Sequence, residues 1–228
     1  MSAALLNLLH LSDPALPIGG FSHSAGLETY VQLNTVKDLA SAKEFVIEML
    51  SRNLQYTDAA FVSLAFDAAK ANDFEAIQLL DDECTAVKLP EEIRLASQKL
   101  GMRLIKIFKE LCPDVIADRY KAAIDAKSST GHYCIAFGIF SAAMQISKID
   151  ALTGFYYNAA SGMITNCVKL IPLGQQDGLK LLFSIKPLIL QLAEQSVNPD
   201  RDLIGLCCPG LDIRCMQHEH LYSRLYMS

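Results

Sequence analysis

The chain has 228 residues with a formal net charge of −5, and hydrophobic residues make up 51% of it. A chain of this length can bury one sizeable core, so a single domain over residues 1–228 is the simplest expectation. The net negative charge and the lack of any Lys/Arg run argue against nucleic-acid binding, which needs a basic face. The apolar excess indicates either membrane segments or apolar surfaces that partner chains cover.

The first part of the chain predicts two helices joined by an ordered turn. One helix ends near Leu11, and the two prolines and the Gly-Gly pair of residues 13–20 then fix a turn. Ser22 is predicted to be the N-cap of the second helix, whose first amides can meet an anion or a carboxylate. The simplest interpretation is a tight interhelical loop. A Walker phosphate loop is not indicated, because its lysine is absent.

Helical periodicity dominates the next part of the chain. Apolar side chains recur every three or four positions over residues 39–49 and, after a plausible cap at Thr57 and Asp58, over residues 61–68. The acidic run 81–83 is interpreted as a solvated turn. Alternating strand patterns are absent, so the predicted class is all-α.

A longer helix is predicted after Pro90. Proline followed by Glu91 and Glu92 suits the start of a helix. Its expected buried stripe consists of Ile93, Ala96, Leu100, Leu104, Ile107 and Leu111.

The middle of the chain is uncharged over residues 128–147 and again over 151–168. Both stretches approach membrane-spanning length, so a membrane-associated protein using the 128–168 hairpin is one interpretation. Their Asn, Gln, Ser and Thr side chains cost free energy in hydrocarbon, and flanking basic clusters are missing, which favours a buried central hairpin. Asp150 is placed to cap the second helix. Three glycines would let neighbouring helices approach closely: Gly138, Gly154 and Gly162.

Beyond the hairpin, Lys169 is a lone charge near the end of an apolar helix, where the helix dipole favours a cation. It either extends outward into solvent or contacts a partner or a phosphate. Gln175 lies in a Gly-Gln-Gln-Asp loop, and some GTPases use a glutamine to orient water. The following helix should kink or restart at Pro187 and end at residues 197–199.

The segment from about residue 200 onward is predicted to be a looser tail. Cys215, His218 and His220 admit a zinc or nickel interpretation, but their spacing matches no closed site, so no metal and no cofactor are predicted. A polar and aromatic tail that becomes ordered on a partner is favoured over a frayed terminus. Whether the tail binds nickel transiently is left open.

The remaining chemistry-bearing residues point away from catalysis. No nucleophile and base can be paired, so we expect no enzyme. The seven cysteines show no Cys-x-x-Cys spacing and no signal peptide opens the chain, which predicts free thiols and a cytoplasmic protein.

Several segments taken together resemble the UreF family of urease accessory proteins. The resemblance rests on Leu16-Pro17-Ile18-Gly19 with Phe21-Ser22 and Gly26-Leu27-Glu28, on Arg94-Leu95-Ala96-Ser97 with Leu100-Gly101, on His132 with Ala136-Phe137-Gly138, on Lys169-Leu170-Ile171-Pro172-Leu173-Gly174-Gln175, and on Leu211-Asp212-Ile213-Arg214 with His218-Glu219 and Tyr222-Ser223-Arg224-Leu225.

Membership in this family implies an all-α homodimer that is not an enzyme. Such proteins bind UreD/UreH, recruit the GTPase UreG, and assist nickel delivery to the urease apoprotein. Stimulation and gating of GTP hydrolysis both stay open. With the helical pattern, the resemblance predicts a bundle of roughly ten helices around the buried hairpin, with a flexible tail over about 200–228 that becomes ordered on its partner.

The resemblance also implies roles for individual residues. The UreG-facing residues would be Glu28, Lys169 and Gln175. The residues of the tail that face UreD/UreH would be Arg214, His218, Tyr222 and Arg224. Many relatives have arginine at the position of Lys169, and lysine cannot form a bidentate fork, so an arginine-finger role is not expected there. The tail also departs from the usual pattern at Gln217, His220, Leu221, Tyr226 and Met227, which removes positive charge.

Overall fold

The computed structural model describes residues 3–206 and 208–227, and these residues form helices and connecting segments without a strand. The all-α prediction is therefore confirmed. The helices run in the order α1 (Ala3–Leu11), α2 (Leu27–Gln32), α3 (Leu39–Glu48), α4 (Asp58–Lys70), α5 (Phe74–Val87), α6 (Glu91–Leu111), α7 (Val115–Asp125), α8 (Tyr133–Ala143), α9 (Lys148–Leu170), α10 (Gln175–Ser184), α11 (Lys186–Ser196) and α12 (Pro209–His218).

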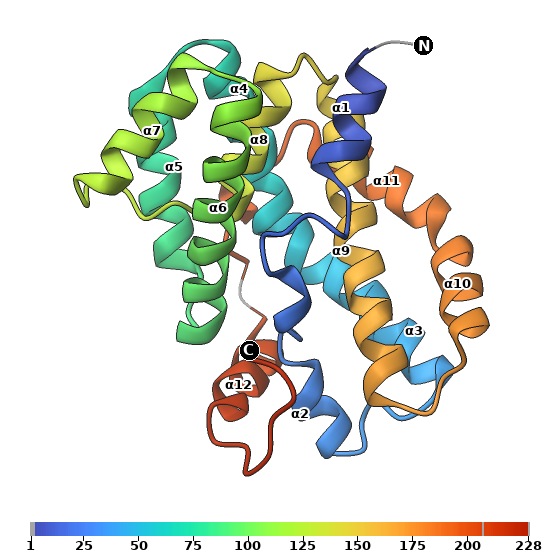
Figure 1. The fold of residues 1–228 in the computed structure, drawn as a ribbon. Coiled ribbons are helices and arrows are strands. Elements are labelled where there is room, and N and C mark those ends of the chain that lie inside the picture. The colour runs from blue at the N-terminus through green and yellow to red at the C-terminus, as the bar shows by residue number, and fades with distance from the viewer. Residues whose placement is uncertain (1–2, 207, 228) are drawn as a thin grey trace.

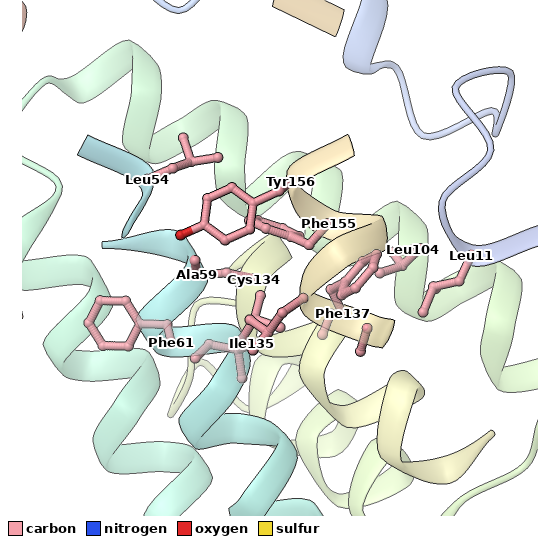
Figure 2. Close-up of a cluster of buried hydrophobic side chains, with 14 of the residues drawn as sticks. Leu11, Leu54, Ala59, Phe61, Leu104, Cys134, Ile135, Phe137, Phe155 and Tyr156 are labelled. Atoms are coloured by element: carbon pink, nitrogen blue, oxygen red, sulfur yellow. The ribbon is translucent and has the colours of Figure 1, made fainter. Parts of the chain in front are cut away.

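Helix α8 lies at the centre of the molecule, and its residues 134–142 are all buried. A helix that is apolar all round needs neighbours on every side, and α4 and α6 supply the most extensive ones. Figure 2 shows side chains from several helices meeting there, among them Phe61 of α4, Phe137 of α8 and Phe155 of α9. The rings of Phe137 and Phe155 lie edge to face, with centroids 5.1 Å apart. The core therefore forms around α8.

Glycines set how closely neighbouring helices approach α8 and α9. A Cβ at Gly138 would lie 2.6 Å from the carbonyl oxygen of Val62, so α4 packs directly on this glycine. A Cβ at Gly154 would lie 2.6 Å from Leu8, which confirms that α1 approaches α9 there. The prediction for Gly162 is wrong, because nothing lies within 4 Å of that position.

The two helices of the central hairpin do not fit the membrane interpretation. Helix α8 has 11 residues, whereas the longer α9 carries Lys148, Asp150 and Lys169. Across the part of the chain that the structure describes, no helix combines the length and the apolar character needed to cross a bilayer. Helix α9 also exposes 40% of Tyr157, so it is buried on one face only.

Side-chain caps fix several helix starts. The side chain of Ser147 accepts a hydrogen bond from the amide of Asp150, so Ser147 caps α9, and the prediction that Asp150 does so is wrong. Helix α4 begins at Asp58 as expected, but the hydroxyl of Thr57 donates to the carbonyl of Asn53 instead of capping α4. Asp38 and Ser41 form a capping box at the start of α3.

Helix α6 begins after Pro90 as predicted, but its buried face is rotated from the expected stripe. Leu111 is 60% exposed, whereas Ser97 and Gly101 are buried. A Cβ at Gly101 would lie 2.1 Å from the carbonyl oxygen of Gly131. The small residues therefore turn toward the segment that leads into α8, and part of the apolar stripe faces outward.

The chain after α9 follows the predicted breaks. Helix α10 ends at Ser184 and α11 restarts with Pro187 in its first turn, then ends at Ser196. The segment beyond residue 200 is more regular than expected, because it contains α12. Figure 1 shows α12 and the C-terminus beside α2, at the opposite end of the molecule from the N-terminus.

Candidate partner-binding site

Glu28 occupies the first turn of α2 and is 5% exposed. Its carboxylate accepts hydrogen bonds from two backbone amides near the C-terminus, that of Leu225 at 2.7 Å and that of Tyr226 at 3.2 Å. A buried carboxylate requires such donors, because burial removes its water. Glu28 therefore fixes the end of the chain to α2.

His218 is fully buried at the end of α12 and lies between two carboxylates. Its Nε2 atom is 3.2 Å from Glu28, and its Nδ1 atom is 2.7 Å from Glu92 of α6. Carboxylates only accept hydrogen bonds, so both contacts are satisfied only when both ring nitrogens carry a proton. Arg224 places a guanidinium 2.6 Å from Glu92. We call Glu28, Glu92, His218 and Arg224 the tail clasp.

Further contacts hold the tail on both sides of the tail clasp. The amide of Met227 donates to the carbonyl of Ser22 at 2.8 Å, and the hydroxyl of Thr29 donates to the carbonyl of Arg214 at 3.0 Å. Cys215 packs on Gly26, where an added Cβ would lie 2.8 Å from its sulfur. The tail is thus seated on α2 and α6 of its own chain, where the sequence suggested a loose segment.

The other side of the docked tail faces outward. Tyr222 is fully exposed there. We call the exposed apolar side chains of the tail the outer tail face: Ile213, Met216, Tyr222, Leu225 and Met227. Arg214 lies nearby, and its guanidinium donates to the side chain of Gln217.

The structure groups the predicted site residues differently from the sequence. Glu28 lies with His218 and Arg224 in the tail clasp, and it is buried there. Lys169 at the end of α9 and Gln175 at the start of α10 are both exposed. Glu28 therefore does not share an exposed surface with these two residues. Glu92, which completes the tail clasp, was not among the predicted residues.

The possible metal ligands of the tail point in different directions. Both ring nitrogens of His218 face carboxylates, and His220 is exposed. Burial raises the pKa of the Cys215 thiol to about 12, and Asp212 and Glu92 add to this effect, so the thiolate that a metal needs is disfavoured. Within residues 3–206 and 208–227, no three side chains of ligand type gather in a way that could hold a metal ion.

The Pro/Gly-rich turn before α2 forms a fixed loop beneath the tail. The guanidinium of Arg103 donates to the carbonyl of Ile18 at 2.9 Å and lies over Gly19, where a Cβ would be only 2.0 Å from it. Ser22 is not an N-cap: it ends a short 3-10 turn, and its hydroxyl donates to the carbonyl of Gly19. Burial and the nearby Lys99 and Arg103 lower the pKa of His23 in this loop.

Asp81 is a second buried carboxylate, and its burial was not predicted from the sequence. It is fully buried in α5, so the prediction of a solvated turn is wrong. Its carboxylate accepts from the hydroxyl of Tyr120 and from the amides of residues 130–132, which lead into α8. The missed signal is its spacing, since it shares one helical face with Ile77 and Cys84.

Several polar side chains surround this carboxylate. His132 lies 2.9 Å from the hydroxyl of Thr85 and 3.0 Å from that of Ser97. Burial, followed by the charge of Asp81, holds the pKa of Tyr120 well above its usual range, so the phenol keeps its proton and donates to the carboxylate. We call Asp81, Tyr120, Thr130 and His132 the core polar cluster.

A buried ion pair lies near the core polar cluster. The ammonium of Lys88 is 2.7 Å from Asp58, and their side chains are 7% and 17% exposed. Burial opposes the charge of Asp58, but Lys88 outweighs it, and the pKa of Asp58 is lowered. Cys84, Cys112, Cys134, Cys167 and Cys215 form no disulfide, as predicted, whereas Cys207 and Ser228 lie outside the described residues.

The fold and the tail clasp define an all-α protein that seats its own C-terminal tail with buried charges and leaves apolar side chains on the outside. Comparison with known proteins identifies its family. The family model for UreF matches residues 36–186, and the chain belongs to the UreF family of urease accessory proteins.

Relatives named urease accessory protein UreF match over nearly the whole chain. One from Actinobacillus pleuropneumoniae serotype 5b (strain L20) is 47% identical over 97% of this chain and 97% of its own length. One from Haemophilus influenzae (strain ATCC 51907) is 48% identical over 97% of this chain and 94% of its own length. One from Bacillus sp. (strain TB-90) is 33% identical over 98% of this chain and 99% of its own length.

Proposed function

We propose that this chain is a cytoplasmic, non-enzymatic scaffold for the insertion of nickel into the urease apoprotein. It binds UreD/UreH through its C-terminal tail, recruits the GTPase UreG, and influences the GTP cycle of UreG. It acts as a homodimer. Family membership supports the role in urease assembly, and the exposed outer tail face supports the use of the tail as a binding surface.

The outer tail face is the observation that carries the proposal. It combines exposed aliphatic and methionine side chains with Tyr222 and the neighbouring Arg214. Aromatic, methionine and arginine side chains are enriched in protein interfaces, and tyrosine and arginine often carry much of the binding energy. A docked tail presents these side chains in one arrangement, so less conformational entropy is lost on binding.

A second surface is proposed for UreG at the junction of α9 and α10. Lys169 and Gln175 are exposed there, close to a break between two helices. A lysine supplies a compact positive charge, and a glutamine supplies both a donor and an acceptor. These two side chains suit contact with an acidic or phosphate-bearing surface.

Co-purification with separately tagged UreD/UreH and UreG tests both surfaces. Replacing Tyr222→Ala together with Leu225→Ala should weaken UreD/UreH capture by about tenfold or more, because interface anchors carry most of the binding energy. Leu79→Ala is the matched control, since Leu79 is 69% exposed on α5, far from the tail in sequence. Equal capture by the double variant and the control would contradict the proposed tail interface.

The second surface needs a different pair of variants. Lys169→Ala with Gln175→Ala should lower UreG capture and nickel-loaded urease while leaving UreD/UreH capture intact. Lys180→Ala on α10 is the control, because Lys180 is exposed and faces only the weak pair with Asp177. Unchanged UreG capture in the first variant would remove the case for this surface.

A further inference from the structure

We propose that His218 makes the docking of the tail depend on a proton: the tail is held while His218 is protonated and is released when His218 loses its proton. This inference rests on the proposed function and adds a means of regulation to the same tail. It concerns the tail of the isolated chain, so it can fail while the partner interface stands.

The geometry of the tail clasp requires the charged form of His218. Both ring nitrogens face acceptor oxygens, at 3.2 Å from Glu28 and 2.7 Å from Glu92. A neutral imidazole has one N–H, so one of the two carboxylates would meet a nitrogen lone pair instead of a donor. Because the His218 side chain is 1% exposed, water cannot relieve this contact.

The charges of the tail clasp balance only with His218 protonated. Glu28 and Glu92 contribute two negative charges, and Arg224 contributes one positive charge. With His218 charged, the four groups are neutral overall; with His218 neutral, a partly buried site keeps one uncompensated negative charge. Such a charge is strongly destabilising in a site of low polarity.

The surroundings shift the pKa values of other titratable groups near the tail clasp. Burial raises the pKa of Cys215 on α12 to about 12, and burial followed by Glu28 raises the pKa of Tyr226. His23 lies toward Glu92 from the loop below, and burial with Lys99 and Arg103 lowers its pKa. An imidazole is the side chain that ordinarily titrates near neutral pH, and His218 supplies the imidazole of the tail clasp.

The sign of the effect follows from linkage. Release of the tail exposes His218 to water, and an imidazole in water is mostly neutral above about pH 6.5. Docking then takes up one proton, so the docking equilibrium weakens by up to about tenfold for each pH unit above that value. The tail is therefore docked in mildly acidic solution and is progressively released in alkaline solution.

Amide hydrogen–deuterium exchange on the full chain measures this directly. The amides of Leu225 and Tyr226 donate to Glu28 in the docked state and are free in the released state. Exchange rates are compared at about pH 6 and about pH 8.5, after division by the rates of a synthetic peptide covering residues 219–228. Protection of these two amides should fall by about tenfold or more, whereas amides of α8 should keep theirs.

Two variants separate proton linkage from ordinary fraying. In Glu92→Gln, the amide can donate to Nδ1 of a neutral His218, so the tail should stay docked and the pH dependence should flatten. In His218→Gln, no titrating group remains in the tail clasp, so the protection should be lower and independent of pH. His220→Gln is the control, because His220 is exposed, and it should behave like the unmodified chain.

Wild-type protection that does not change over the pH range would overturn the proposal, and so would a pH dependence that survives in His218→Gln. Capture of UreD/UreH is measured in parallel at one pH. If the tail shows no pH dependence but Tyr222→Ala with Leu225→Ala still loses UreD/UreH, the proton linkage is wrong and the partner interface stands. If only the capture result fails, the partner interface is wrong and the linkage stands.

Discussion

Asp81 and Glu28 make the same kind of contact in two different regions of the molecule. Each buried carboxylate accepts backbone amides from a distant part of the chain: Asp81 from residues 130–132, and Glu28 from residues 225 and 226. Each also lies close to a histidine. The regions differ in charge, because the donors around Asp81 are neutral, whereas Glu28 shares His218 with a second carboxylate.

The difference in position decides what each carboxylate does. Asp81 joins α5 and α7 to the start of α8, so its contacts break only when the core opens. Glu28 holds a terminal segment that can leave without exposing α8. Local openings of this kind have a lower free energy than global unfolding. We therefore expect the buried carboxylate in the core to stabilise the fold and the one at the chain end to stabilise a local contact.

The largest effect should come from Asp81→Ala. This change leaves several backbone amides and the Tyr120 hydroxyl buried without an acceptor, which should lower the free energy of unfolding by about 3–5 kcal/mol. Urea denaturation measures the loss. Asp82→Ala, at the exposed neighbouring position, should leave the unfolding midpoint unchanged. If the two variants are equally stable, the core polar cluster does not have the role given to it here.

A similar loss is expected when the buried ion pair near the core is broken. Lys88→Ala leaves Asp58 buried without its partner and should cost about 3–5 kcal/mol. The pKa of Asp58 is lowered in the fold, so its contribution is present above about pH 4 and is lost as the pH falls further. Acid unfolding curves of Asp58→Asn should therefore lack the loss of stability below about pH 4.

The pair of Lys148 and Asp67, with side chains 15% and 57% exposed, is the comparison for that loss. The Asp67 side chain is 57% exposed, so Lys148→Ala should cost no more than about 1 kcal/mol. A cost as large as that of Lys88→Ala would show that burial is not the cause.

A smaller and local effect is expected at the chain end. Glu28→Ala removes the acceptor for two tail amides, so the tail should lose about 1–3 kcal/mol of docking free energy while the core keeps its stability. Limited trypsin digestion should then cut at Arg224 faster than in the unmodified chain. Glu91→Ala, at an exposed position beside Glu92, should not change the digestion rate. A lower unfolding midpoint for the core in Glu28→Ala would contradict the separation of the two regions.

The smallest effect on stability is expected for Tyr222→Ala. The side chain is fully exposed, so its removal should leave both the thermal midpoint and the tail protection unchanged. Differential scanning calorimetry checks this. A clear loss of stability would mean that Tyr222 packs on its own chain and is not free to meet a partner.

The spacing of apolar residues predicted where the helices lie better than it predicted which of their faces are buried. The uncharged run of 128–147 predicted a buried helix, and α8 confirms it. The expected stripe of α6 is rotated because Gly101 allows close packing, which overrides the count of apolar residues. Asp81 was missed because a charged residue is normally exposed, and only its position among Ile77, Leu80 and Cys84 indicates burial.

The candidate site could be predicted only in part. The sequence singled out Glu28, His218 and Arg224, but it assigned them to two different surfaces. Contacts between residues almost two hundred positions apart depend on how the tail returns to α2, which no local pattern records. Glu92 was interpreted as a residue of a helix start, and its role in the tail clasp appears only once α12 lies against α6.

The central claim is that Glu28 seats the tail on its own chain and so presents the outer tail face to UreD/UreH. Hydrogen–deuterium exchange near pH 6 tests it most directly, with the chain free and bound to UreD/UreH. We predict that the amides of Leu225 and Tyr226 are protected in the free chain, keep their protection in the complex, and lose it in Glu28→Ala. Full exchange of these amides in the free chain at that pH would contradict the claim.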